Sequence, residues 1–213
     1  GKTTFFNVIT GLYQPDTGSF ELAGKPYSPS APHEVAKAGI ARTFQNIRLF
    51  GNMTALENVM VGRHVRTRAG VLGAMLNNAA TKAEEAAIRQ RAIDLLHYVR
   101  IEDRADDLAK NLSYGDQRRL EIARCMVTQP EILMLDEPAA GLNPKETKEL
   151  DELIAELRSH HNTTILLIEH DMKLVMGISD RIYVVNQGTP LANGTPEEIR
   201  NNPDVIRAYL GEA

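Results

Sequence analysis

The sequence is poor in cysteine, in basic charge and in long apolar runs, and each shortage excludes a class of protein. Cys125 is the only cysteine among 213 residues, so an internal disulfide cannot form and a reducing compartment is expected. Its apolar helical surroundings predict core packing rather than a reactive thiol. Lys and Arg total 24 against 28 Asp and Glu, a formal net charge of −4, which argues against a general nucleic-acid binder.

Long hydrophobic segments are missing as well. The longest apolar runs, such as 132–135 and 165–168, are far too short to cross a bilayer. The sequence also shows no secretory signal. If this protein serves a membrane, we therefore expect it to do so through a partner subunit.

The patterns that are present alternate between strand and helix around a long helical region. Continuous apolar segments at 131–135 and 163–168 are typical of parallel strands buried on both faces, and 181–185 predicts a third buried strand. Residues 54–127 read as helical almost throughout, and a short strand is expected at 19–22. This alternation predicts an α/β fold with an all-helical insertion.

The first candidate for chemistry is Gly1-Lys2-Thr3-Thr4, which matches the second half of the pattern G-x-x-x-x-G-K-[ST]. In such a loop the backbone N–H groups hold phosphates at a helix N-terminus. Lys2 would reach the β- and γ-phosphates, and the Thr3 hydroxyl would bind Mg²⁺. The alternative is a polar start before a helix, and four residues alone do not decide between them.

The second candidate is the pair Asp136-Glu137 at the end of the apolar segment 132–135. Two adjacent carboxylates at the end of a buried strand repel each other and lose solvation, so a compensating partner is expected. A metal ion would compensate: Asp136 would hold Mg²⁺ through water, and Glu137 would polarise a hydrolytic water. The alternative is that the two acids cap the following loop.

Three further polar segments have equally plain alternatives. The segment Ser113-Tyr114-Gly115-Asp116 suits a γ-phosphate, but it also reads as a helix start with Ser113 as N-cap and Asp116 at N3. Gln45 ends a predicted strand and would bind Mg²⁺ or water, unless it is a surface residue. His170 follows the strand 163–168, at the mouth of the predicted sheet where ligands bind in such folds.

Taken in chain order, these segments resemble the five motifs of the ABC ATPases. Lys2-Thr3, Gln45, the Ser113 segment, Asp136-Glu137 and His170 stand in the order Walker A, Q-loop, signature, Walker B and switch histidine. The resemblance covers essentially the whole chain. A narrower likeness, to ATP-binding subunits of branched-chain amino acid importers, lies in the segments 41–50, 113–115, 141–144 and 196–210.

The family resemblance implies a fold, a reaction and a set of site residues. It implies one nucleotide-binding domain over 1–213 with a P-loop NTPase core, small antiparallel strands and a helical subdomain; the core would be 1–50 with 128–213, and the subdomain 51–127. ATP and Mg²⁺ would be bound, and ATP hydrolysed, with Glu137 as base and His170 holding the γ-phosphate and the attacking water. The implied nucleotide contacts are Gly1, Lys2, Thr3, Thr4, Gln45, Asp136, Ser113, Gly115 and Asp116, and the implied metal ligands are Thr3, Gln45 and Asp136.

The same resemblance implies partners. A second ABC ATPase subunit would form a head-to-tail dimer with this one, and transmembrane permease subunits would dock on that dimer. A solute-binding protein would act indirectly. Nucleic acid is not expected to bind. The expected place is cytoplasmic, peripheral on the inner face of the cell membrane. Competing hypotheses are a soluble ABC ATPase acting on nucleic acid or ribosomes, and a non-catalytic interaction module. The first usually carries duplicated cassettes, long coiled-coil insertions or basic arms, which are not visible, and Glu137 with His170 argues against the second.

The sequence departs from the common family pattern at three places. Tyr114 and Asp116 replace the usual Gly and Gln of the signature, and Asn143 stands where many relatives carry the D-loop Asp. The chain also begins at Gly1, inside the phosphate loop, which reads as an N-terminal truncation. We expect the isolated chain to bind ATP poorly, because half of the phosphate-binding amides would be missing, and the complete protein to hydrolyse ATP.

Overall fold

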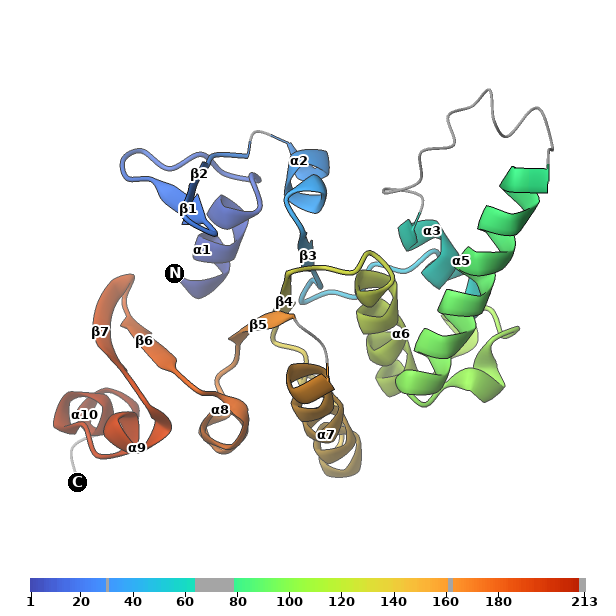
Figure 1. Ribbon diagram of the computed structural model, residues 1–213. Helices are drawn as coiled ribbons and strands as arrows, with labels where there is room; N and C mark the ends of the chain where they lie inside the picture. Colours follow the sequence, from blue (N-terminus) through green and yellow to red (C-terminus); the bar gives the residue numbers. More distant parts are fainter. Residues whose placement is uncertain (30, 64–78, 161–162, 211–213) are drawn as a thin grey trace. The chain divides into compact units, whose positions relative to one another are not determined.

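The computed structural model describes residues 1–29, 31–63, 79–160 and 163–210, which form two compact units (Figure 1). One unit contains residues 1–32 and 168–213, and the other contains residues 33–167.

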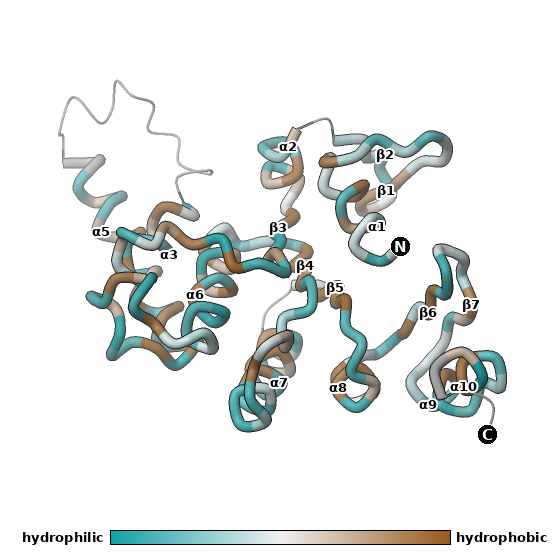
Figure 2. The backbone as a smooth tube through the Cα atoms, turned by 180° about the vertical axis from the view of Figure 1, so that it is seen from behind, coloured by the Kyte–Doolittle hydropathy of each residue, from teal (hydrophilic) through white to brown (hydrophobic). Residues whose placement is uncertain are grey.

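The unit 33–167 contains a short parallel sheet. Its strands are β3 (Ile40–Arg42), β4 (Ile132–Asp136) and β5 (Thr164–Ile168), in the order β3-β4-β5, and β3 runs parallel to β4 with Arg42 beside Met134. Leu133, Met134 and Leu135 have no exposed surface, which confirms the predicted burial of this strand. The hydrophobic colour along β4 and β5 is visible in Figure 2. A three-stranded sheet whose central strand is buried from Leu133 to Asp136 gives the acids at the end of β4 a rigid support.

Helices make up the rest of this unit. The α-helices are α2 (Pro32–Lys37), α3 (Ala55–Arg63), α5 (Ala79–Tyr98), α6 (Tyr114–Met126) and α7 (Pro144–His160), and two 3₁₀ turns lie at η2 (Glu102–Arg104) and η3 (Ala109–Asn111). Helices α3, α5 and α6 pack on one another, as the helical pattern predicts. The part of that pattern at 64–78 lies outside the described residues. The apolar stripe that α5 buries consists of Ile88, Ala92, Leu95 and Leu96, and the buried Val99 follows directly after the helix.

The unit formed by 1–32 and 168–213 contains two antiparallel hairpins and four helices among its described residues. The hairpins are β1 (Phe20–Leu22) with β2 (Lys25–Tyr27), and β6 (Ile182–Asn186) with β7 (Thr189–Gly194). The helices are α1 (Lys2–Ile9), α8 (Met172–Ile178), α9 (Pro196–Arg200) and α10 (Pro203–Leu210). Ile182, Val184, Ile199 and Val205 form a small buried cluster.

Two predicted strands differ from the expectation of burial on both faces. In β5, Thr164 is exposed, 165–167 are half-buried and only Ile168 is buried. The strand expected at 181–185 is present as β6, but it pairs antiparallel with β7 and its burial alternates along the strand, where burial on both faces was expected. Tyr183 on β6 is 67% exposed. The apolar run of β6 resembles that of a buried parallel strand. Its partner β7 is hard to recognise from the sequence because it contains Pro190, and proline is unusual within a β-ladder.

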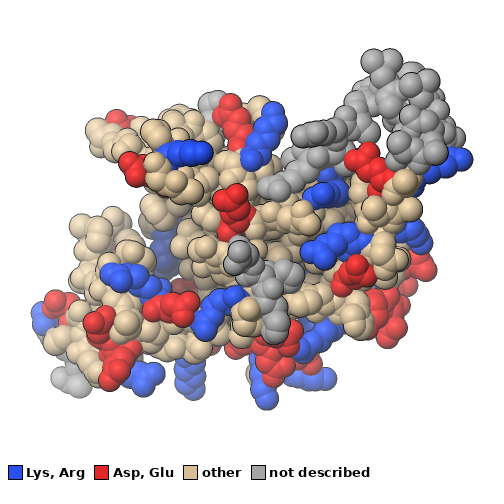
Figure 3. Space-filling model, in the orientation of Figure 1, with Lys and Arg blue, Asp and Glu red and all other residues tan. Residues whose placement is uncertain are grey.

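The fold class predicted from the sequence is confirmed: the chain is mixed α/β, with a parallel sheet, antiparallel hairpins and a helical region. Within the described residues, none of the helices is long and apolar enough to span a membrane. On the face drawn in Figure 3, acidic and basic side chains are interspersed.

Candidate functional site

Asp136 is the last residue of β4, and its carboxylate is buried. The side chain is 1% exposed, and the Arg42 guanidinium on β3 donates a 2.7 Å hydrogen bond from Nη2 to Asp136 Oδ2. The second oxygen, Oδ1, is buried and has no hydrogen-bond partner among the described atoms. Such an oxygen is suited to accept a hydrogen bond from a water bound to Mg²⁺, because magnesium keeps several of its waters and binds few protein carboxylates directly.

Glu137 follows at a sharp bend of the backbone. Its φ is 46°, a left-handed conformation that is uncommon for a residue with a side chain and that clusters at functional sites. The bend directs the carboxylate to Gln45, whose Nε2 donates a 3.0 Å hydrogen bond to Glu137 Oε2. The structure thus brings together two of the predicted site residues from the ends of neighbouring strands.

The signature segment forms the start of α6. Ser113 is the N-cap of this helix, and its hydroxyl accepts a 3.1 Å hydrogen bond from the backbone N–H of Asp116, as the helix-start reading predicts. Gly115 is buried, and a Cβ added there would lie 2.9 Å from Oε1 of Glu146. A Cβ added at Gly141 would lie 3.2 Å from the Tyr114 ring. The first turn of α6 therefore packs closely against the turn that leads into α7.

Asn143, which replaces the D-loop Asp, caps α7. Its Oδ1 accepts hydrogen bonds from the N–H groups of Lys145 and Glu146, both at 3.0 Å, and Glu146 Oε2 accepts from the Asn143 N–H at 3.0 Å. This is the reciprocal arrangement of a capping box. Substitution of the usual Asp by Asn keeps the acceptor that the cap needs.

The phosphate-loop candidates lie in the other unit, at the start of α1. Lys2 is the first helical residue of α1, and Thr3 and Thr4 are exposed. A Cβ added at Gly1 would lie 3.2 Å from the Cα of Gly188, in the turn between β6 and β7. Backbone N–H groups and a lysine at the start of a helix suit an anion.

His170 lies between β5 and α8. Its side chain is 66% exposed, and Nδ1 lies 3.9 Å from Oε2 of Glu169, whose own side chain is 2% exposed. Asp171 caps α8 by accepting from the N–H groups of Lys173 and Leu174 at 2.8 and 3.3 Å. The imidazole is thus held at the start of a capped helix and stays accessible.

Sequence reasoning did not single out three charged residues that the structure places in or beside the site. Arg42 neutralises Asp136, and Arg118 with Glu121 on α6 forms a buried ion pair. A lone cation in an apolar strand, and opposite charges three residues apart on a mainly apolar helix face, were the signals that could have found them. Burial raises the pKa of Glu121, and the Arg118 guanidinium opposes that rise.

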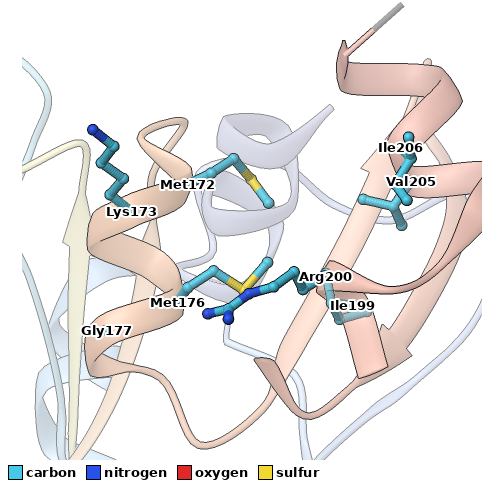
Figure 4. A pocket seen from close by; sticks show the side chains of 8 residues that line it. All are labelled: Met172, Lys173, Met176, Gly177, Ile199, Arg200, Val205 and Ile206. Carbon is cyan, nitrogen blue, oxygen red and sulfur yellow. The ribbon is translucent and has the colours of Figure 1, made fainter. Parts of the chain in front are cut away.

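A pocket of about 440 Å³ lies elsewhere, within the unit that contains the C-terminal helices (Figure 4). Its described lining residues include none of the predicted nucleotide contacts and are mostly apolar: Met172, Lys173, Met176, Gly177, Ile199, Arg200, Val205 and Ile206. Among the described residues, no three His, Cys, Asp or Glu side chains are grouped so that they could hold a metal ion by themselves. A magnesium ion at Asp136 would therefore take most of its ligands from water and nucleotide phosphates.

Comparisons with known proteins agree with this arrangement. The family model described as "ABC transporter" matches residues 1–140, and "Branched-chain amino acid ATP-binding cassette transporter" matches residues 189–213. The high-affinity branched-chain amino acid transport ATP-binding protein LivG of Salmonella typhimurium is 64% identical over 213 residues, which are 100% of this chain and 84% of that protein. The protein BraF of Pseudomonas aeruginosa, which has the same description, is 56% identical over the same shares of both chains.

Solved structures of ABC transporter cassettes have a similar fold. The crystal structure of an ATP-binding cassette of an ABC transporter, in its ADP conformation, matches with a TM-score of 0.81 and 30% identity, over 100% of this chain and 84% of that one. The family match, the relatives and the fold agree with the motif order seen in the sequence. The chain therefore belongs to the ABC transporter family, among its ATP-binding proteins.

Proposed function

We propose that this chain is the ATP-hydrolysing subunit of an ABC importer for branched-chain amino acids. The observation that carries the proposal is the hydrogen bond from Gln45 to Glu137, beside the buried Asp136 with its unpartnered oxygen. This arrangement suits the activation of a water next to a magnesium-bound phosphate. The substrate class rests on the LivG and BraF relatives and on the family match at 189–213.

The roles we assign divide the nucleotide between several segments. Gly1, Lys2, Thr3 and Thr4 bind the phosphates through backbone N–H groups, the ammonium and the hydroxyls. Thr3, Gln45 and Asp136 would hold a Mg²⁺ ion that enters with the nucleotide, Asp136 through a water, and this ion would neutralise charge on the phosphates. Ser113, Gly115 and Asp116 contact the γ-phosphate of a nucleotide bound to the opposite subunit.

Hydrolysis needs a base that takes a proton from the attacking water, and this chain can supply that base. Glu137 accepts a proton from the attacking water while the oxygen of that water bonds to the γ-phosphorus. At the same time the bond between the γ-phosphorus and the bridging oxygen breaks, and ADP leaves with that oxygen. General-base help of this kind contributes about 10²–10⁴-fold in rate. His170 donates a hydrogen bond that holds the γ-phosphate and the water in line. Positioning supplies most of the remaining catalysis.

The proposal includes an assembly. Two ATPase subunits close head to tail, the pair docks on transmembrane permeases at the inner face of the membrane, and a solute-binding protein delivers the amino acid on the other side. The core of the domain would be 1–50 with 128–213, and the helical subdomain 51–127. A nucleic-acid substrate is not part of the proposal, in keeping with the formal charge of −4.

Uptake in cells tests the proposed substrate. We expect a chromosomal Glu137→Gln substitution to abolish high-affinity uptake of labelled leucine and to leave uptake of labelled proline through unrelated carriers intact. Glu85→Gln, an exposed acid on α5, is the matched control and should leave both unchanged. Normal leucine uptake in the Glu137→Gln cells, with the variant protein present at wild-type level, would contradict the proposal.

A further inference from the structure

Arg118 and Glu121, near the middle of α6, form an ion pair that is completely removed from solvent. Both side chains have 0% exposure, and Arg118 Nη1 lies 2.9 Å from Glu121 Oε2. Burying two charges costs several kcal/mol for each ion unless further hydrogen bonds satisfy their remaining groups. The pair therefore needs polar partners close to α6.

Those partners are backbone groups of the loop that carries Gln45. Arg118 donates from Nη1 to the carbonyl oxygen of Phe44 at 2.8 Å and from Nη2 to the carbonyl oxygen of Gln45 at 2.9 Å. Glu121 Oε1 accepts from the N–H of Arg48 at 3.3 Å and, more weakly, from the N–H of Phe44 at 3.5 Å. Both charged groups thus bind the same short loop, one through its acceptors and the other through its donors.

The same guanidinium also contacts the start of the signature helix. Arg118 Nη2 lies 3.3 Å from the Tyr114 hydroxyl, and the Arg118 Cζ lies 5.8 Å from the centre of the Tyr114 ring. Tyr114 follows the N-cap Ser113. The Arg118 side chain therefore connects the backbone of Gln45 with the first turn of α6, which begins after Ser113. The side chain of Gln45 in turn bonds to Glu137.

We propose that Arg118 and Glu121 are positioning residues that hold the Gln45 loop to the first turns of α6, so that Gln45 and the Ser113 segment move as one body. The inference rests on the proposed function, because it assigns a use to the roles given there to Gln45 and Ser113. A displacement of the loop is then carried to α6 without rearrangement of either backbone, and a displacement of α6 reaches Gln45 in the same way. A purely stabilising role for the pair is the alternative.

The double variant Arg118→Met with Glu121→Leu separates the two roles. It replaces the pair by apolar side chains of similar size, a change that is often neutral or stabilising for a buried ion pair. Hydrogen exchange without nucleotide is the direct readout. We expect the amides of residues 44–48 to exchange roughly fivefold to tenfold faster, because the N–H groups of Phe44 and Arg48 lose the Glu121 carboxylate and the loop loses its carbonyl bonds to Arg118. The amides of Ile122 and Ala123, further along α6, should keep their protection.

Two other variants complete the test. Arg119→Met with Glu149→Leu removes an ion pair of the same helix that contacts α7 rather than the loop, so exchange at 44–48 should stay at the wild-type level. Arg118→Lys keeps the charge but lacks the planar fork that reaches two carbonyl groups. It should give an intermediate rate of loop exchange in a folded protein.

Turnover gives the functional readout. In the Arg118→Met/Glu121→Leu protein we expect kcat for ATP hydrolysis to fall roughly tenfold, because Gln45 is no longer held in place, while the Kd for a fluorescent ATP analogue changes less than twofold. Wild-type loop exchange in the folded double variant would overturn the inference, as would faster exchange spread evenly over the whole of α6. Since exchange is measured without nucleotide, this outcome is independent of the leucine-uptake result that tests the proposed function.

Discussion

Gln45 and Glu137 are 92 residues apart in the sequence, and their side chains meet in a 3.0 Å hydrogen bond where two neighbouring parallel strands end. The contact exists because β3 and β4 run in the same direction, so that the residues after both strands reach the same edge of the sheet. It places the amide that would contact the metal beside the carboxylate that would act as base.

Loss of this hydrogen bond should impair turnover rather than folding. Gln45→Leu removes the amide donor from an exposed position, so we expect kcat for ATP hydrolysis to fall roughly tenfold or more through loss of positioning. The thermal midpoint should stay within a few degrees of wild type. Phosphate release and thermal unfolding measure the two effects. Asn46→Leu, at the adjacent exposed position, is the matched control, and an equal loss of activity in it would argue against a specific role for Gln45.

Removing one partner of the buried Arg42–Asp136 pair should strongly lower the stability of the fold. Arg42→Met leaves the Asp136 carboxylate buried without its cation, which should lower the free energy of unfolding by about 3–5 kcal/mol. Adding Asp136→Asn to this variant removes the stranded charge and should restore much of the loss. Urea unfolding measures both changes. Arg104→Met breaks an exposed pair with Asp107 and should cost at most about 1 kcal/mol, so a similar loss in both single variants would contradict the assignment.

Glu137 should be required for turnover but not for nucleotide-driven association. In Glu137→Gln of the complete protein we expect steady-state phosphate release to disappear, because the amide cannot accept the proton from water, while ATP still promotes dimer formation. Size-exclusion chromatography with and without ATP detects the dimer. Unchanged turnover in Glu137→Gln would remove this residue from the role of base, and Glu85→Gln again provides the control.

Cys125 should be chemically inert in the folded protein. Burial raises the pKa of its thiol to about 12, so almost no thiolate is present at pH 8 and the sulfur is also inaccessible. Intact-mass analysis after iodoacetamide should show no modification of the native protein and one adduct in guanidinium chloride. A Glu85→Cys variant provides an exposed thiol that should react at once. Rapid labelling of Cys125 in native protein would show that this part of α6 opens readily.

The capping box of α9 should make that helix sensitive to acid. Glu198 accepts from the Thr195 N–H at 2.7 Å and Thr195 Oγ1 accepts from the Glu198 N–H at 3.3 Å, and the backbone N–H of Thr195 lowers the pKa of Glu198. A lowered pKa in the folded state means that the stabilisation is complete above the usual pKa of Glu, about 4.3, and is lost as pH falls through the lowered value. Amide protection of α9 should decline below about pH 4.

Two substitutions at neighbouring glutamates check the origin of this acid sensitivity. Glu198→Gln keeps an acceptor that does not titrate, so the decline in α9 protection should disappear. Glu197→Gln, one residue earlier and outside the box, should leave the decline unchanged. A pH dependence that survives in Glu198→Gln would assign the effect to another group.

Local features were predictable because they depend on neighbours in the chain. The apolar run at 132–135 predicted the strand whose residues 133–135 are buried, and the N-cap expected at Ser113 is present. The capping boxes at Asn143 and Thr195 also consist of residue types at fixed short spacings. The order of the motifs along the chain indicated the family, which the comparisons confirm. β7 escaped prediction because Pro190 obscures its strand pattern.

The sequence by itself determined most of the helices, the strand that carries Asp136, several helix caps and the set of residues able to do phosphate chemistry. Only the tertiary structure decided which of those residues meet. Arg42 and Asp136 are 94 residues apart, and Arg118 reaches the carbonyl oxygen of Gln45 across 73 residues. Such contacts depend on strand register and on how a helix packs against a loop, and short-range spacing carries no information about either. The physical reason is that a buried charged group needs a hydrogen-bonding partner close in space. The packed fold decides which residue that is, and the partner can lie anywhere in the sequence.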